Sequence, residues 1–289
     1  MKNRILLLGS NGYIGSVFKS MLPEKSFIMM GHSDITVQNL LNSWSFNHFD
    51  TIINCAGYVG RPNVDSVEKH KEEGIFGNII IPQIITEFLN IVKDLTLLHI
   101  SSGCIYEDEG SVFTEEDKPN LDWESGCKCS FYSGTKAMAE KIISRYPNHY
   151  ICRLRMPFDH DFNNPRNYLS KLLNYSKLLS LPNSLSNRHE FVKCCIELLD
   201  KECEFGIYNI VNSGFATAEQ VVEIFKKYKT TNKEFKFFSD IEDFYLSTGS
   251  VPRSNCRISN EKLLNTGIQI SNVYDSIENC VKKFHEMGS

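Results

Sequence analysis

The stretch from Gly9 to Gly15 constrains the fold of this chain more than any other part of its sequence. It reads Gly-Ser-Asn-Gly-Tyr-Ile-Gly, follows the apolar run 5–8 and precedes a segment with helical apolar spacing. Glycine permits a tight turn and a close approach of the main chain to a pyrophosphate, which then binds unpaired N–H groups at the helix start. A turn with this spacing, which is not the commonest dinucleotide form, can also simply join a strand to a helix. The stretch predicts a dinucleotide-binding turn, with candidate contacts Gly9, Asn11, Gly12, Tyr13, Ile14 and Gly15.

Segments that read as strands and helices alternate through the first half of the chain. Strands and helices of these lengths, in alternation, predict an α/β fold. We expect a Rossmann-type doubly wound parallel sheet with helices on both faces. We place this domain at 1–157 and a smaller C-terminal α/β domain at 158–289, with segments at about 188–212 returning to the sheet. The second domain has a less regular pattern. The predicted strands include 5–8, 27–33, 50–57, 95–102, 150–156 and 235–238, and the predicted helices include most of 67–92 and about 132–145.

The charge, the apolar runs and the cysteines argue against several classes of protein. The net charge is −4 and no block of lysine or arginine occurs, so nucleic acid is not an expected partner. No apolar run approaches the ~20 residues of a membrane helix, and the run after Met1 ends at Gly9, too early for a signal peptide. We therefore expect a cytoplasmic protein without membrane contact. The ten cysteines are scattered and form no Cys-x-x-Cys pair, which predicts reduced thiols and no metal site.

The ends of the second and third predicted strands bear on the cofactor. In a dinucleotide fold the second strand ends beside the adenine ribose, where a carboxylate would bind the 2′-hydroxyl and repel a 2′-phosphate. Here Gly31, His32 and Ser33 precede the first carboxylate, which favours NADP over NAD. His32 fits an ordinary strand-end turn equally well. At the end of the third strand, small residues would let a cofactor lie close by, and these are Cys55, Ala56 and Gly57.

The segment Tyr132-Ser133-Gly134-Thr135-Lys136 carries the strongest chemical signal. Residues four apart share one helix face, and a lysine there can lower a phenol pKa from about 10 towards neutrality. Such a tyrosine can give a proton to a carbonyl oxygen as hydride arrives, and the lysine can also hold the nicotinamide ribose. Ser102 ends a strand 30 residues earlier and would hydrogen-bond the same carbonyl. The pair Tyr-x-x-x-Lys also occurs by chance in many helices, so its meaning depends on the glycine turn and the serine.

With these residues the chain resembles the extended short-chain dehydrogenase/reductases that act on nucleotide sugars. Within them it is similar to the epimerase/reductase of UDP-L-rhamnose synthesis, which in plants stands alone or forms the last part of a larger synthase. The resemblance covers essentially the whole chain. It rests on the segments 60–65, 102–106, 115–120, 131–138, 155–157, 164–167 and 252–255, among them Ser-Gly-Cys-Ile-Tyr, Tyr-Ser-Gly-Thr-Lys, Asn-Pro-Arg-Asn and Pro-Arg-Ser-Asn.

The resemblance implies a substrate, UDP-4-keto-6-deoxyglucose, and two reactions. The carbons beside the ketone, C3 and C5, are epimerised, and the ketone is then reduced by NADPH, with NADH as the alternative. A ketone acidifies the neighbouring C–H bonds, so one polarised carbonyl serves both steps. In the family the acid and base of epimerisation are a cysteine and a lysine that match Cys104 and Lys171. Taken alone, Cys104 would read as a small buried hydrophobe and Lys171 as a surface lysine.

Further expectations follow from the same resemblance. The C-terminal domain would bind the nucleotide sugar, with candidate contacts Arg61, Asn63, Asn167 and Arg253, each of which could equally be a structural residue. If the strand continues past Ser102, its side chain and that of Cys104 point to the same side. The loop 107–131 departs from the family pattern, and its Trp123, Cys127 and Cys129 have no assigned role. By analogy with the family we expect a homodimer.

Three functional hypotheses remain at the level of sequence. The first is the bifunctional epimerase/reductase, and the second is a 4-reductase that needs a separate epimerase. The third is a cofactor-binding regulatory subunit without catalysis, although such relatives usually lose the tyrosine or lysine that this chain retains. The sequence leaves open whether the sugar carries UDP or dTDP.

Overall fold

A six-stranded parallel sheet forms the centre of the computed structural model, which describes residues 4–24, 26–61, 63–107, 110–126, 128–248 and 254–288. Every neighbouring pair of strands in it runs parallel. The predicted α/β fold with a doubly wound sheet is therefore confirmed. In spatial order the strands are β2 (Phe27–Met30), β1 (Ile5–Leu8), β3 (Thr51–Asn54), β4 (Thr96–Ser102), β6 (His149–Leu154) and β9 (Gly206–Asn209).

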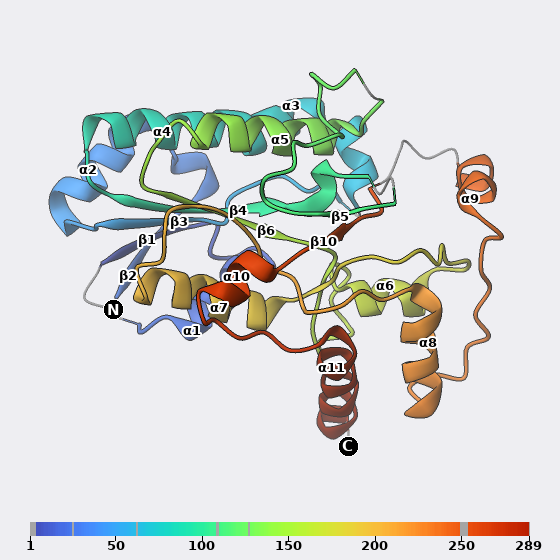
Figure 1. Ribbon diagram of the computed structural model, residues 1–289. Helices are drawn as coiled ribbons and strands as arrows, with labels where there is room; N and C mark the ends of the chain where they lie inside the picture. Colours follow the sequence, from blue (N-terminus) through green and yellow to red (C-terminus); the bar gives the residue numbers. More distant parts are fainter. Residues whose placement is uncertain are drawn as a thin grey trace.

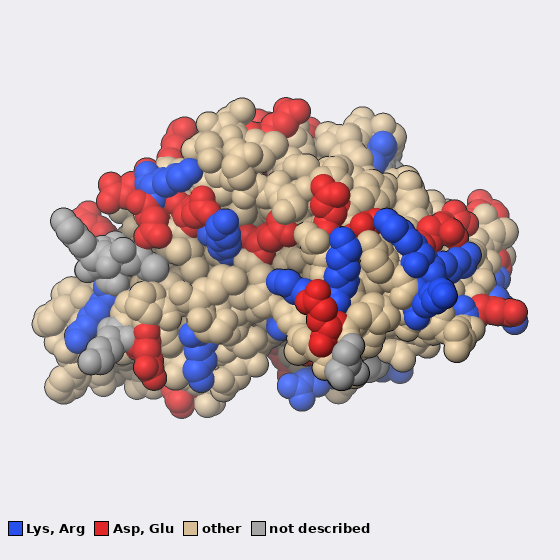
Figure 2. Space-filling model, turned by 90° about the horizontal axis from the view of Figure 1, so that it is seen from below, with Lys and Arg blue, Asp and Glu red and all other residues tan. Residues whose placement is uncertain are grey.

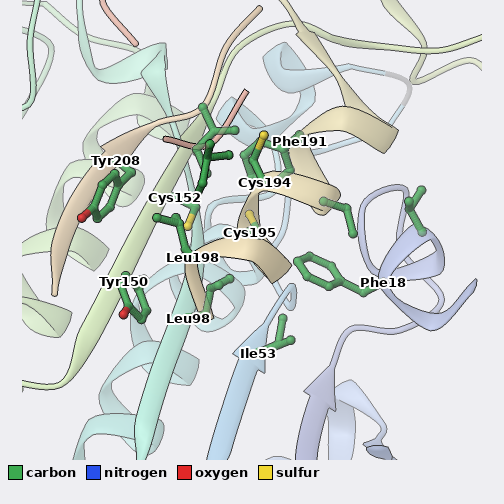
Figure 3. Packing of buried hydrophobic residues seen from close by; sticks show 14 of the residues in the cluster. Phe18, Ile53, Leu98, Tyr150, Cys152, Phe191, Cys194, Cys195, Leu198 and Tyr208 are labelled. Atoms are coloured by element: carbon green, nitrogen blue, oxygen red, sulfur yellow. The ribbon is translucent and has the colours of Figure 1, made fainter. Parts of the chain in front are cut away.

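Helices cover both faces of this sheet (Figure 1). One face carries α1 (Gly15–Met21) and α7 (Arg188–Asp200), and the other carries α2 (Val37–Asn47), α4 (Ile81–Ile91) and α5 (Phe131–Ile143). Figure 3 shows the first interface, where Phe18 of α1 and Phe191 of α7 belong to one apolar cluster with Ile53 and Leu98 of the strands. Because both faces are covered, the strands are apolar along their length rather than alternating: all four residues of β1 are buried.

One helical run, Lys71–Ile91, has the length and composition to cross a membrane. It consists of α3 (Lys71–Ile75), a π-helical turn η3 (Phe76–Ile80) and α4. The sequence-based statement that no apolar run approaches this length is therefore corrected. Half of the run is buried inside the protein, where α4 packs against the sheet with Ile81, Ile85, Phe88 and Leu89.

Elements that follow residue 157 and lie outside the sheet surround a third apolar cluster, which includes Phe162, Leu169, Phe225 and Ile277. The helices α6 (Tyr168–Asn174), α8 (Ala218–Lys227) and α11 (Val273–Gly288) contribute to it. Short elements complete the chain: α9 (Ile241–Thr248), α10 (Glu261–Asn265), the pair β7 (Pro157–Phe158) with β8 (Ser186–Asn187), the pair β5 (Val112–Phe113) with β10 (Arg257–Ile258), and the 3₁₀ turns η1 (His32–Asp34), η2 (Val64–Glu68) and η4 (Gly103–Ile105).

Four strand predictions need correction, and two of these strands end three residues early: the strand over 27–33 ends at Met30 and the strand over 50–57 ends at Asn54. The predicted strand over 235–238 is a single bridge between Phe237 and Leu178. The predicted strand 150–156 ends at Leu154, and Met156 adopts φ +39°, a left-handed conformation that interrupts extended backbone. On the face seen in Figure 2, acidic and basic side chains both occur across the surface, as the small net charge implies.

Candidate active site

The glycine turn lies where the strand order reverses. From β1 the chain passes to β2 on one side and later to β3 on the other, which opens a crevice at the carboxyl ends of β1 and β3. Gly9 has φ +72°, and a Cβ there would lie 2.6 Å from the Ala56 nitrogen. A Cβ on Gly15 would lie 2.1 Å from the Gly9 oxygen. The turn therefore packs directly on the end of β3 and needs glycine at both positions. The two segments predicted to contact a cofactor, 9–15 and 55–57, thus lie against each other.

Tyr13 connects this turn to the second half of the chain. The Arg188 Nη1 donates to the Tyr13 carbonyl over 2.9 Å, and the guanidinium lies 4.3 Å from the centre of the tyrosine ring. Arg188 also forms an ion pair with Asp159, whose side chain is fully buried. Burial and the Asp159 charge raise the pKa of the Tyr13 phenol. The side chain of Tyr13 is thus part of a structural network with Arg188 and Asp159, and its place in a cofactor site stays a prediction.

His32 and Ser33 lie in η1 at the end of β2, and both are exposed. The His32 ring packs edge-on against Phe76, with 5.3 Å between ring centres. Together they line a cleft of about 400 Å³, to which Tyr58, Glu72 and Glu73 also contribute. The structure thus brings His32 to the expected edge of the sheet, and it adds two carboxylates from α3 that the sequence pattern did not indicate.

Beyond the end of β4, three predicted catalytic side chains come together. The strand ends at Ser102, and η4 follows, so the expected extension of the strand to Cys104 is wrong. Instead the turn folds back, and the Cys104 N–H donates to the Ser102 Oγ over 3.2 Å. Ser102 and Cys104 both lie near enough to the Tyr132 phenol to influence its pKa, which Ser102 lowers and Cys104 raises. Ser102, Cys104 and Tyr132 therefore share one site.

The predicted effect of Lys136 on Tyr132 differs from what the structure shows. Burial raises the pKa of the Tyr132 phenol, and the charges that oppose this rise belong to Arg166 and Arg155. The Lys136 Nζ donates to the Ile100 carbonyl over 2.9 Å. Burial lowers the pKa of Lys136 to about 8, against the attraction of Glu140. The cost of burying the phenolate outweighs the effect of a lysine four residues away, on which the prediction rested.

Under Lys136 lies a buried ion pair between Glu140 of α5 and Arg153 of β6. The Arg153 Nη2 lies 2.7 Å from the Glu140 Oε2, and both side chains are at most 6% exposed. Ser101 donates to Glu140 over 2.5 Å, and the Arg153 Nη1 donates to the Tyr106 hydroxyl over 2.9 Å. These bonds fix α5 against β4 and β6, and so they set the position of the tyrosine and lysine on α5.

Replacing Lys136 with methionine should raise the free energy of unfolding at pH 7, because it removes a charge that burial disfavours. The pKa of Lys136 is about 8 when folded and 10.5 ordinarily, so the unfolded chain binds its proton more tightly. The stabilisation should be full below about pH 8 and should vanish as the pH rises from 8 to 10.5. Urea unfolding of both proteins at pH 7 and pH 10 measures this, and a gain that does not shrink with pH would contradict the burial of a charged lysine.

Besides Glu140 and Arg153, sequence reasoning did not single out three residues of this site. Asn78, in the π-helical turn, donates to the Thr135 Oγ1 over 3.1 Å and also bonds the backbone of Tyr58, so it joins the segment that follows β3 to α5. Arg155 reaches Cys104, and Arg166 lies near Tyr132. The two arginines belong to segments that carry the family resemblance, whereas no local signal marks Asn78.

The residues predicted to contact substrate differ in their burial and hydrogen bonding. Asn167 is fully buried and caps α6, and its Nδ2 donates to Asp159 and to the Asp161 carbonyl, so we assign it to the loop and not to substrate. Asn63 caps η2 and remains half-buried, and Arg61 is exposed. Arg253 lies outside the described residues.

Lys171 lies on α6 and is half-buried. The helix begins directly after the loop that carries Arg166, whose Nη2 donates to the Gly60 carbonyl over 3.3 Å. The effect of the Tyr132 charge on Arg166 shows that this loop lies beside the phenol. The roles of Lys171, Arg61 and Asn63 remain predictions.

The loop 107–131 packs against the helix that carries Tyr132. A Cβ on Gly134 would lie 2.1 Å from the Trp123 Nε1, so the indole covers the glycine directly. Trp123 also contacts Phe131, with 5.4 Å between ring centres. Cys129 is half-buried, and Cys127 lies outside the described residues. Trp123 therefore has a packing role on the first turns of α5.

Comparison with known proteins places these features in a family. The family model of the RmlD substrate binding domain matches residues 3–286. A trifunctional UDP-glucose 4,6-dehydratase/UDP-4-keto-6-deoxy-D-glucose 3,5-epimerase/UDP-4-keto-L-rhamnose-reductase of Arabidopsis thaliana is 30% identical over 295 residues, 95% of this chain and 41% of that protein. A bifunctional dTDP-4-dehydrorhamnose 3,5-epimerase/dTDP-4-dehydrorhamnose reductase of the same plant is 33% identical over 233 residues, 78% of this chain and 74% of that protein. The chain spans 31–41% of the length of the trifunctional relatives.

Solved structures show the same fold. The L780 UDP-rhamnose synthase of Acanthamoeba polyphaga mimivirus matches with a TM-score of 0.85 at 21% identity, over 97% of this chain and 99% of that one. A dTDP-4-dehydrorhamnose reductase of Bacillus anthracis in complex with NADP matches with a TM-score of 0.80 at 16% identity, over 99% and 100%. Because the family model matches nearly the whole sequence, the chain belongs to the RmlD substrate binding domain family.

Proposed function

We propose that this chain is a bifunctional 3,5-epimerase/4-reductase that converts UDP-4-keto-6-deoxy-D-glucose to UDP-L-rhamnose with NADPH. The observation that carries the proposal is the meeting of Ser102, Cys104 and Tyr132 at one point beyond β4. A reductase alone needs the serine and tyrosine, whereas the cysteine is an additional proton-carrying group beside them. Relatives at 30% and 33% identity whose names include both activities support this assignment.

The crevice beside β1 and β3 fits a dinucleotide. A Cβ on Gly12 would lie 3.2 Å from the Gly9 oxygen, so the turn is tight here too, and its glycines place no side chain between the backbone and a pyrophosphate. The residues that would hold the cofactor are those of the turn 9–15, His32 and Ser33 at the adenine end, and Cys55, Ala56 and Gly57 beneath. We infer NADPH, which supplies a hydride, because a structural relative was solved with NADP.

In the reduction, Tyr132 gives the proton. Its phenol has a raised pKa and is therefore a neutral O–H donor at pH 7, which suits transfer of a proton to the C4 carbonyl oxygen. Ser102 hydrogen-bonds the same oxygen and polarises the carbonyl. Lys136, held on the Ile100 carbonyl, would hold the nicotinamide ribose.

In the epimerisation, Lys171 and Cys104 act on opposite faces of the sugar. A base removes the proton from a carbon beside the ketone, and an acid returns a proton from the other side. Ser102 and Tyr132 stabilise the enolate oxygen between these steps, so the carbonyl site serves both reactions. Arg61, Asn63 and Arg166 are the candidate contacts of the diphosphate. The homodimer and the cytoplasmic location expected from the sequence stay predictions.

Product analysis tests the proposed function. The chain is incubated with UDP- or dTDP-4-keto-6-deoxyglucose and with NADPH or NADH, and the product is identified by NMR. We expect UDP-L-rhamnose in the reaction with the UDP-sugar and NADPH. Oxidation of NADPH without inversion at C3 and C5 would indicate a 4-reductase, and no oxidation with any pair would indicate a non-catalytic subunit.

Replacing Cys104 with alanine should separate the two activities. Inversion at the carbons beside the ketone should fall by about 10²–10⁴-fold, the usual contribution of a general acid, whereas deuterium exchange through the base Lys171 should continue. Reduction of UDP-4-keto-L-rhamnose, which needs no inversion, should persist because Ser102 and Tyr132 remain. NMR of the sugar in deuterated water and NADPH absorbance measure the two rates. Equal loss of both would contradict a specific role for Cys104.

A further inference from the structure

Arg155 is a buried arginine whose guanidinium reaches the candidate epimerisation cysteine. It follows the last residue of β6 and is 3% exposed. Its Nη1 lies 3.0 Å from the Cys104 Sγ, and its Nη2 donates to the Asn183 Oδ1 over 2.8 Å and to the Ser254 carbonyl. Its backbone N–H donates to the Ser186 Oγ over 3.0 Å. These contacts hold the guanidinium in one place, against the sulfur.

The charge of Arg155 lacks the partner that a buried arginine usually has. Arg153, two residues earlier, forms a bidentate pair with the Glu140 carboxylate. In the part of the chain that the structure describes, the Arg155 guanidinium bonds only uncharged groups, namely a thiol, an amide and a carbonyl. A buried charge is costly unless it is paired. The site therefore favours an anion next to Arg155.

Two thiols lie beside this guanidinium, and their surroundings differ. The Cys256 thiol is fully buried and donates to the Gly103 carbonyl over 3.2 Å, which requires the protonated form. Burial also raises the pKa of Cys256. Cys104 is only half-buried and lies beside Tyr132, where a substrate carbonyl would be held. The anion that the guanidinium can stabilise without loss of a hydrogen bond is the Cys104 thiolate.

We propose that Arg155 is the positioning residue that allows Cys104 to alternate between thiol and thiolate during epimerisation, an inference that rests on the proposed function. When Cys104 protonates the substrate carbon, its S–H bond breaks, a C–H bond forms and the sulfur keeps the electron pair. Arg155 stabilises that thiolate, which then recovers a proton from solvent or from the next carbon. The guanidinium keeps its own proton throughout.

The alkylation rate of Cys104 tests this pairing without any substrate. The thiolate is the form that reacts with iodoacetamide, and mass spectrometry with fragment ions assigns the label to individual cysteines. Removing the neighbouring cation in Arg155→Gln should slow labelling of Cys104 at pH 7 by about tenfold or more. Raising the pH to 9 should largely restore the rate, which loss of structure would not do. Arg155→Lys, which keeps the charge, should retain much of the wild-type rate.

Two controls compare the labelling of Cys104 with that of the other thiols. Cys256→Ser removes the other thiol beside Arg155 and should leave Cys104 labelling unchanged. Within the wild-type protein, Cys104 should react faster at pH 7 than Cys129, which is also half-buried but whose pKa is raised by burial and by the charge of Asp122. This comparison needs no variant and decides the matter if Arg155→Gln does not fold.

Wild-type labelling of Cys104 in folded Arg155→Gln at pH 7, or no preference for Cys104 over Cys129, would overturn the proposal. Inversion at C3 and C5 of the keto-sugar is measured in parallel and should fall in Arg155→Gln more than reduction of UDP-4-keto-L-rhamnose does. If the wild-type protein exchanges no deuterium, the proposed epimerase function fails, while the labelling result still shows whether Arg155 and Cys104 are paired.

Discussion

Reduction of the keto-sugar should be about 10²–10⁴-fold slower in Tyr132→Phe than in the wild-type protein, because the variant lacks the proton donor. The buried phenol is a neutral donor, and Ser102, Arg166 and Arg155 lie near enough to influence its pKa. Phenylalanine fills the same space and removes only the hydroxyl. NADPH absorbance with UDP-4-keto-L-rhamnose as substrate measures kcat, and the Michaelis constant should change less than kcat.

Tyr146→Phe is the matched control for this experiment. Tyr146 is also buried, and its hydroxyl donates to the Leu95 carbonyl at the far end of α5 and β4. Loss of that bond should lower stability by about 1 kcal/mol and leave kcat unchanged. Turnover of Tyr132→Phe at the wild-type rate would show that another group supplies the proton.

Glu140→Ala should lower the free energy of unfolding by about 3–5 kcal/mol, the cost of leaving a buried charge without its partner. Glu140 is 4% exposed and accepts hydrogen bonds from Arg153 and Ser101, which join α5 to β6 and β4. It also opposes the effect of burial on the pKa of Lys136, so the lysine should lose its proton at still lower pH in the variant. Urea unfolding followed by circular dichroism measures the loss.

A surface ion pair provides the comparison for Glu140→Ala. Glu223 lies 2.8 Å from Lys226 on α8, and both side chains are mostly exposed. Glu223→Ala should cost less than about 1 kcal/mol, because water screens exposed pairs. Equal losses of stability in Glu140→Ala and Glu223→Ala would contradict the view that the Glu140–Arg153 pair stabilises the fold through its burial.

The glycine turn and the run of apolar strands were sufficient to predict the fold. Strand and helix periodicities are local, and a parallel sheet covered on both faces requires them in alternation. The short pair β5 with β10 was not predictable in this way, since it joins residues 112–113 to residues 257–258. The predicted strand over 235–238 was wrong because its aromatic residues pack around the third cluster and pair at one position only.

The candidate site, like the fold, could be predicted from the sequence only where its residues have local signals. The sequence identified Ser102 and Tyr132 because a strand end and a helix face are local features. It did not identify Asn78 or Glu140, whose roles come from contacts with segments far along the chain. The pKa of Tyr132 was predicted in the wrong direction, since helical spacing shows the neighbouring lysine but not the burial of the phenol. Asn167 was a candidate substrate contact because of the family resemblance, with a structural role equally open, and its amide is used within its own loop.

Deuterium incorporation tests the central claim, that one site both epimerises and reduces, most directly. The wild-type protein is incubated with UDP-4-keto-6-deoxyglucose in deuterated water without NADPH, and the recovered sugar is examined by NMR. We predict deuterium at C3 and C5, no inversion at either carbon with Cys104→Ala, and conversion to UDP-L-rhamnose by the wild-type protein once NADPH is added. A wild-type protein that oxidises NADPH with this sugar but leaves both carbons free of deuterium would contradict the claim.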